Sequence, residues 1–189
     1  MAARAGLTRR DVVDAAVSLL DEGVALGDVS LGAVARRLGI RPQSLYAHVD
    51  GVDGLRRAVA TVGLELLAPE VVEASIGRVG VEAVDAIVRV HLEFAKRRPG
   101  FYEAMLQPPG DDRQLAGAMR SVAAPLEIVL SSLAMVESDR VHWTRLFLST
   151  VYGYVSLQHA GRFSLPVEIR PTEDRLVRML TTQLAPLPV

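Results

Sequence analysis

The stretch Ser30–Val49, S-L-G-A-V-A-R-R-L-G-I-R-P-Q-S-L-Y-A-H-V, decides the fold. Its first residue is a good N-cap, and the apolar residues that follow recur at helical spacing, which predicts a short helix over Leu31–Leu38. Gly39 can supply the positive φ that ends this helix, and a proline opens the next one, expected over Pro42–His48. Two short helices joined by such a turn cross steeply, which is typical of a helix-turn-helix motif.

The outward side chains of the second helix offer the chemistry of DNA recognition. Once Ile40 and Leu45 are assigned to the core, the remaining positions hold hydrogen-bond donors, acceptors and an amphipathic aromatic ring, which suit base edges and phosphates. These positions are Arg41, Gln43, Ser44, Tyr46, Ala47 and His48. The alternative is an ordinary helical hairpin inside an all-helical core.

Helices are also expected on both sides of this motif. The sequence T-R-R-D from Thr8 has the spacing of a capping box and predicts a helix over Arg9–Glu22. After the motif, Asp50-Gly51 interrupts the chain and a fourth helix begins near Asp53. The first third of the chain is therefore expected to be entirely helical.

The rest of the chain shows helical periodicity separated by breakers. We expect Pro69 and Gly77–Gly80 to interrupt it, and Pro125 to kink or split a helix. The helices are expected over Val81–Arg98, Phe101–Leu106, Arg113–Leu133, Asp139–Gly161 and Thr172–Leu184. No strand or repeat is evident, so the predicted class is all-α.

Composition indicates a globular protein that needs no disulfide to fold. Half of its 189 residues are hydrophobic, cysteine is absent, and the formal net charge is −1. Apolar runs are far shorter than the roughly 20 residues of a membrane span, and no signal-peptide pattern is evident, so a cytoplasmic protein is expected. The motif carries Arg36, Arg37 and Arg41 and no acid. This small basic island suits phosphate binding.

The residues from Thr8 to Leu55, taken together, resemble the TetR family of bacterial one-component regulators. The likeness runs through L-G-A-V-A-R-R-L-G-I, then S-L-Y-A-H-V, then D-G-L. It implies an N-terminal three-helix DNA-binding domain over residues 1–55, with the motif at about 30–49, and a helical ligand-binding and dimerisation domain over 56–189. It also implies a homodimer that contacts DNA through Thr8, Ser30, Arg41, Pro42, Gln43, Ser44, Tyr46 and His48.

One departure from the family concerns the start of the fourth helix. Many members have Ser or Asn followed by Lys there, whereas this chain has Gly51 and Val52. A phosphate-contacting amine is therefore missing. We expect few charged phosphate contacts and a shallow dependence of DNA affinity on salt.

The helix expected over Asp139–Gly161 has two faces that predict two roles. One face carries small residues with a neighbouring leucine, which permits close packing of helices and predicts a two-fold dimer interface built with the final helix. Its residues are Ser149, Gly153, Ser156, Leu157 and Ala160. Packing within one chain is an alternative that the sequence leaves open.

The opposite face of this helix is aromatic and joins other apolar residues in a predicted effector site. Ligand pockets are mostly apolar with a few placed polar groups, so an apolar or aromatic small molecule is expected. The candidate ligand-binding residues are His91, Phe94, Phe101, Tyr102, Met105, Trp143, Phe147 and Tyr154. Gln158 and His159 are further polar candidates. Each aromatic residue has the alternative role of filling the core.

The sequence carries no pattern that points to catalysis. Its four histidines lie on different predicted helices, and the chain lacks a phosphate-binding Gly-rich loop with Lys-Ser/Thr, G-x-S-x-G and H-E-x-x-H. We therefore expect no catalytic residue, metal or cofactor. The resemblance to the TetR family implies a ligand-responsive repressor that binds a pseudo-palindromic operator as a homodimer. The alternatives are a DNA-binding dimer without a ligand and a helical adaptor that binds only proteins.

Overall fold

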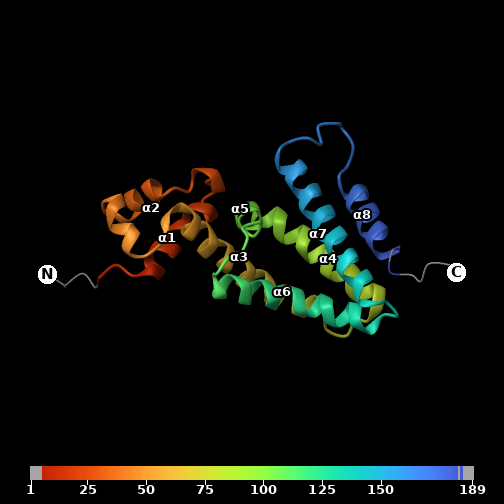
Figure 1. Ribbon diagram of the computed structural model, residues 1–189. Helices are drawn as coiled ribbons and strands as arrows, with labels where there is room; N and C mark the ends of the chain where they lie inside the picture. Colours follow the sequence, from red (N-terminus) through yellow and green to blue (C-terminus); the bar gives the residue numbers. More distant parts are fainter. Residues whose placement is uncertain (1–5, 183, 185–189) are drawn as a thin grey trace. The chain divides into compact units, whose positions relative to one another are not determined.

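The computed structural model describes residues 6–182 and 184, which form helices and connecting loops with no strand among them (Figure 1). The α-helices are α1 Arg9–Asp21, α2 Leu31–Leu38, α3 Gly51–Ser75, α4 Gly80–Arg97, α5 Pro99–Ala104, α6 Arg113–Ser132, α7 Glu137–His159 and α8 Arg170–Thr182. Two short 3-10 helices are η1 Leu26–Asp28 and η2 Pro42–Ala47. The predicted all-α class is confirmed. The final helix was expected over Thr172–Leu184, and residue 183 of that range lies outside the described residues.

The chain divides into two compact units. The first comprises the residues up to Leu64 together with Gly100–Gly117, and the second comprises Glu65–Pro99 together with the residues from Ala118 onward. The boundary expected after residue 55 falls inside α3, and the assignment of domains stays a prediction. Each unit has a core of its own.

The first unit is built around α1, α2 and η2, with α2 packed against both of the others. Val12 on α1, Val34 on α2 and Leu45 on η2 are completely buried. Segment Gly100–Gly117 adds α5 to this unit, where a Cβ on Gly63 would lie 3.1 Å from the Cβ of Phe101. A side chain at position 63 would therefore be tight against Phe101 and would require it to shift by a few tenths of an ångström.

In the second unit, α4 packs against α7 and α8, and these two also contact each other (Figure 1). Helix α4 is amphipathic and buries Val84, Ile87 and Val88 completely. Its opposite face carries charged side chains. None of the helices in the described part of the chain combines the length and the apolar character that a bilayer span requires.

Two prolines lie inside helices, which corrects the expectation that Pro69 interrupts the chain and excludes a split of the helix at Pro125. Pro69 lies within α3, and α6 continues across Pro125. A proline in a helix interior costs about 3 kcal/mol because it removes a hydrogen bond and crowds the preceding turn. The continuous α3 buries Leu67 and Val71 on either side of Pro69. Tertiary packing therefore overrides the local preference.

Candidate functional site

The helix-turn-helix begins at a serine and turns at a glycine, as the sequence predicted. The Ser30 hydroxyl accepts a hydrogen bond from the Ala33 amide at 3.2 Å and caps α2. Gly39 ends this helix with a φ of +67°, a conformation that side-chain-bearing residues adopt with strain. These two local features fix where η2 starts.

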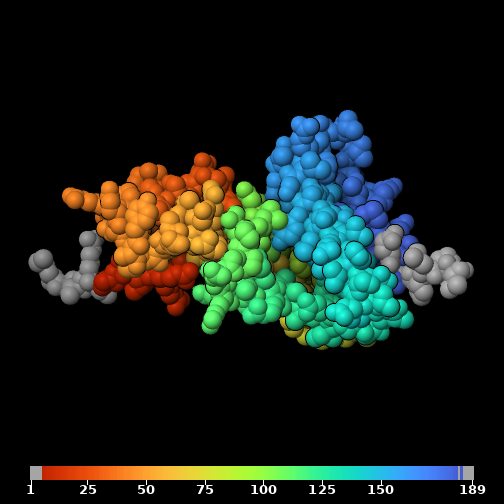
Figure 2. Space-filling view, viewed as in Figure 1, coloured from red at the N-terminus to blue at the C-terminus, as the bar shows by residue number. Residues whose placement is uncertain are grey.

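The second helix of the motif, η2, is a 3-10 helix rather than an α-helix. The Ser44 amide donates to the Arg41 carbonyl at 3.0 Å, which is an i→i+3 bond. Leu45 is completely buried and anchors the segment, whereas Gln43, Ser44 and Tyr46 are exposed. The Tyr46 side chain is 65% exposed although it is aromatic. This segment belongs to the orange part of the surface in Figure 2.

A capping box opens α1 at Thr8. The Thr8 hydroxyl accepts from the Asp11 amide at 3.2 Å, and the Asp11 carboxylate accepts from the Thr8 amide at 2.8 Å. Hydrogen bonds from the Thr8 side chain and backbone lower the pKa of Asp11 below its usual value. The exposed Thr8 and Ser30 therefore lie at the first turns of two helices.

An ion pair that the sequence analysis missed connects α2 to the end of α1. The two terminal nitrogens of Arg37 donate to the two carboxylate oxygens of Glu22 at 2.8 and 2.7 Å. This bidentate geometry holds both planar groups in one orientation. The hydrogen bonds from Arg37 lower the pKa of Glu22. Arg36, Arg37 and Arg41 of the motif are all exposed, but Arg37 is engaged in this ion pair.

The eight predicted DNA-contact residues lie at or near the surface of the first unit. Thr8, Ser30, Arg41, Pro42, Gln43, Ser44 and Tyr46 are exposed and His48 is half-buried. Their contact with DNA stays a prediction.

Three of the predicted ligand-binding residues pack against one another in the second unit. The Phe147 ring stacks on the Trp143 ring, with ring centres 5.7 Å apart. It also contacts the His91 ring edge-to-face, with ring centres 5.1 Å apart. The Trp143 indole donates to the Leu180 carbonyl at 3.0 Å. All three side chains are buried, which agrees with the alternative role of filling the core.

His91 is held neutral in this cluster. Its Nδ1 lies 2.9 Å from the Ile87 carbonyl, which can only accept, so Nδ1 carries the proton. Burial lowers the pKa of His91, although the bond to Ile87 opposes that shift. An uncharged imidazole therefore belongs to the core of the second unit.

The other predicted ligand-binding residues are distributed between the units. Phe94 and Tyr154 are buried in the second unit, whereas Phe101, Tyr102 and Met105 are buried in the first. The proposed role of the eight residues in ligand binding stays a prediction.

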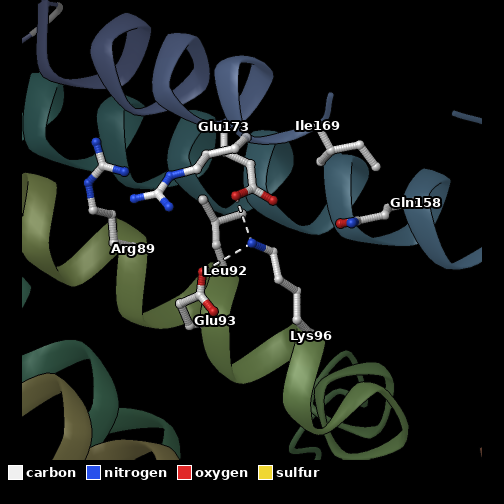
Figure 3. Close-up of a pocket in the computed structure, with 8 residues that line it drawn as sticks. Arg89, Leu92, Glu93, Lys96, Gln158, Ile169 and Glu173 are labelled. Atoms are coloured by element: carbon white, nitrogen blue, oxygen red, sulfur yellow. Dashed lines mark hydrogen bonds and ion pairs between the residues drawn. The ribbon is translucent and has the colours of Figure 1, made fainter. Parts of the chain in front are cut away.

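A pocket of about 480 Å³ opens in the second unit and is lined mainly by charged side chains (Figure 3). Helix α4 supplies one face of it, with Arg89, Leu92, Glu93 and Lys96. The ends of α7 and α8 and the residue before α8 supply the rest: Gln158, Ile169, Arg170 and Glu173. Gln158 was named from the sequence as a polar candidate, but none of the eight predicted ligand-binding residues lines this pocket.

A buried carboxylate organises the inner part of this pocket. Glu173 is only 6% exposed, and its oxygens accept from Lys96 at 2.6 Å and from the Tyr154 hydroxyl at 3.1 Å. Burial is the largest effect on Lys96 and opposes its charge, but the hydrogen bonds to Glu173 and Glu93 outweigh it and raise the pKa. Burial first, and then the charge of Glu173, raise the pKa of Tyr154. The network therefore joins α4, α7 and α8.

Sequence reasoning missed this network because the residues are far apart in the chain. The available clue was the spacing of Arg89, Glu93 and Lys96 on one face of α4, which needs acids and bases from another helix. Glu173 and Asp174 at the start of α8 supply the acids, and Arg89 donates to Asp174 at 2.8 Å. Within residues 6–182 and 184, no three His, Cys, Asp or Glu side chains gather as metal ligands do.

The five predicted interface residues, four on α7 and one at its C-cap, are exposed in the single chain. They are Ser149, Gly153, Ser156, Leu157 and Ala160. Leu146 on the same helix is 54% exposed, and Met179 on the neighbouring α8 is 51% exposed. The surface formed by these seven residues is called the α7–α8 face below. Its role as a dimer interface stays a prediction.

Comparisons with known proteins agree with this architecture in sequence and in structure. Residues 84–180, just over half of the chain, match the family model described as "Tetracyclin repressor-like, C-terminal domain". The HTH-type transcriptional regulator YobS of Bacillus subtilis is 32% identical over 158 residues, which cover 83% of this chain and 82% of that protein.

Solved structures with low sequence identity share the fold. The TetR family regulator PfmR from Thermus thermophilus superposes with a TM-score of 0.60 at 16% identity, covering 92% of this chain and 97% of that one. The multidrug binding protein EbrR, solved in complex with imidazole, gives 0.58 at 19% identity over 96% and 91% of the two chains. The protein therefore belongs to the TetR family of helix-turn-helix transcriptional regulators.

Proposed function

We propose that this DNA-binding regulator is a ligand-responsive repressor that acts as a homodimer on a pseudo-palindromic operator. The observation that carries the proposal is the arrangement of η2, where Leu45 is buried while Gln43, Ser44 and Tyr46 are exposed. An amide, a hydroxyl and a phenol presented together match the donors and acceptors of a major groove. Since TetR-family members are transcriptional regulators, no catalytic role is assigned.

The contacts divide into those that read bases and those that hold the backbone. Gln43 and Arg41 are the base-reading candidates, because an amide pairs with adenine and a guanidinium pairs with guanine. Tyr46 reaches a phosphate with its hydroxyl while its ring packs on sugar or a thymine methyl. Thr8 and Ser30 bring helix N-termini to phosphates, where amide donors and the helix dipole favour an anion.

The α7–α8 face supports the proposed homodimer. It combines the half-exposed Leu146 and Met179 with small residues, and a Cβ built on Gly153 would meet no atom within 4 Å. A second copy can therefore approach the α7 backbone closely. A two-fold interface uses the same surface of both protomers, so one such face is sufficient for a dimer.

Ligand control requires that the effector bind the operator-competent conformation more weakly than the other conformation. The binding of imidazole by the structural relative EbrR supports a small-molecule effector for this chain. By thermodynamic linkage, operator DNA should weaken effector binding by the same factor. Equal effector affinity with and without operator DNA would refute this coupling.

The experiment that tests the proposal is a gel shift of the purified protein on DNA that flanks its own gene, at a stated salt concentration with specific competitor. We expect saturable binding that resists nonspecific competitor, with two protomers per operator by light scattering. If no fragment of the whole genome is bound specifically, the regulator is not acting through an operator and the proposal is wrong.

A further inference from the structure

Most of the charges in the α4–α8 pocket already have partners within the protein. Lys96 donates to Glu173 and also to Glu93 at 3.0 Å (Figure 3). Arg89 donates from Nε to Asp85 and from Nη1 to Asp174, both at 2.8 Å. The buried carboxylate of Glu173 has both of its oxygens occupied. A ligand must therefore be recognised by the groups that remain.

The groups that remain are mainly hydrogen-bond donors, together with Oε2 of Glu93, whose side chain is 61% exposed. Among the described residues, none forms a hydrogen bond or a close ion pair with the Arg170 guanidinium, although Asp174 is near enough for electrostatic attraction. Within residues 6–182 and 184, the Nη2 group of Arg89 and the side-chain amide of Gln158 likewise form no hydrogen bond. Arg89 and Gln158 lie at opposite ends of the pocket (Figure 3).

The pocket also has a charge balance and an apolar surface that restrict the ligand. Its lining contains three cations and two carboxylates, and the N-terminus of the 13-residue α8 adds positive potential. Leu92 and Ile169 are its apolar lining residues. The volume of about 480 Å³ is within the range of small-molecule sites.

We infer that this pocket binds a small organic carboxylate, whose anionic group is held by Arg170 and the remaining donors of Arg89. The apolar part of the ligand packs on Leu92 and Ile169 and extends toward Gln158. A guanidinium suits this role because its planar donors match both oxygens of a carboxylate. The ligand's role as the effector rests on the proposed function, but its binding to the pocket does not.

A cationic ligand fits the same pocket less well. The buried carboxylate of the pocket, Glu173, already accepts from Lys96 at 2.6 Å and from Tyr154. The other carboxylate, Glu93, also accepts from Lys96, and its side chain is 61% exposed, so solvent weakens its attraction for an ammonium group. If the ligand displaced Lys96 from Glu173, the Lys96 ammonium group would lose its buried partner, which is energetically costly. Carboxylate binding requires no such exchange.

The test is isothermal titration of the full chain with hexanoate, hexylamine and 1-hexanol, three probes that differ mainly in the charge of one end. We expect hexanoate to bind more tightly than the other two. In the Arg170→Gln protein, hexanoate affinity should fall about tenfold to a hundredfold, as expected for the loss of a hydrogen bond between charged groups. The matched control is Arg178→Gln, which removes the same charge from the exposed surface of α8 outside the pocket and should change the affinity less than threefold.

The outcomes separate this inference from the proposed function. Tighter binding of hexylamine, an absence of hexanoate binding, or equal hexanoate affinity in the wild-type and Arg170→Gln proteins overturns the carboxylate site, even if operator DNA is bound. Hexanoate binding that depends on Arg170 supports the site. If that binding leaves operator affinity unchanged, the site stands and the role of this ligand in regulation is wrong.

Discussion

Replacing Gly153 with arginine is expected to separate the proposed dimer without unfolding the protomer. Gly153 lies on the exposed side of α7, and a Cβ added there would meet no atom within 4 Å. Arginine is also a better helix former than glycine, by somewhat less than about 1 kcal/mol. The stability of the single chain should therefore be unchanged or slightly higher.

The effect on the dimer is much larger because two-fold symmetry introduces the substitution twice. Each guanidinium would enter an interface of small and apolar side chains, near its own symmetry copy and without an acid to pair with. An uncompensated buried charge costs about 3 kcal/mol or more. Since every 1.4 kcal/mol is a factor of ten in Kd, we expect dimerisation to weaken by at least on the order of a hundredfold.

Sedimentation velocity over a range of protein concentrations measures this change directly, with thermal unfolding by circular dichroism as the test of folding. The matched control is Gly153→Ala, which keeps a small residue at the same position and should remain dimeric. A Gly153→Arg protein that folds normally and dimerises with the wild-type Kd would refute the α7–α8 face as the interface.

Four further changes test the DNA-binding unit and the core. Tyr46→Ala should weaken operator binding about tenfold in a gel shift with an unchanged circular dichroism spectrum, because it removes about one contact's worth of free energy; unchanged affinity would mean that Tyr46 does not contact DNA. Ser30→Ala should lower the free energy of unfolding by about 1 kcal/mol in urea because α2 loses its cap, whereas Ser30→Thr should lose less. Operator affinity should depend only weakly on salt, since the log–log slope is about −0.9 per neutralised phosphate, and a steep slope would contradict the expectation of few charged contacts. The free energy of unfolding should decrease as the pH falls below 6.5, the ordinary pKa of His91. Burial lowers this pKa only in the folded state, so the unfolded chain binds an extra proton at low pH. The loss is at most about 1.4 kcal/mol per pH unit and should be absent in His91→Gln, as unfolding at pH 7 and pH 5.5 would reveal.

The sequence alone determined the elements whose ends depend on neighbouring residues. The capping box at Thr8, the N-cap at Ser30 and the glycine at position 39 each act within one helical turn, and the structure has α1 and α2 beginning where these residues predicted. Such features are visible in the sequence because the interacting groups are at most a few residues apart.

The two proline-containing helices and the 3-10 helix depended on tertiary structure. Pro69 and Pro125 locally favour a break, but the helices that contain them are stabilised by apolar side chains buried on both sides of each proline. The sequence indicated a short helix over η2 but not its 3-10 geometry, which accompanies the packing of this segment on α2 with Leu45 completely buried. Packing energies of this kind exceed local propensities.

The candidate sites divide in the same way. Six of the eight predicted DNA-contact residues lie between Arg41 and His48, so a motif was sufficient to group them. In the charged pocket, Lys96 and Glu173 are 77 positions apart, and only the packing of α4 against α8 brings their side chains within 2.6 Å. Likewise, the sequence showed that α7 has an aromatic face and a face of small residues, but only the structure decided which of them α4 and α8 bury. Aromatic burial removes more apolar surface from water, so that face is in the core and the small residues remain exposed.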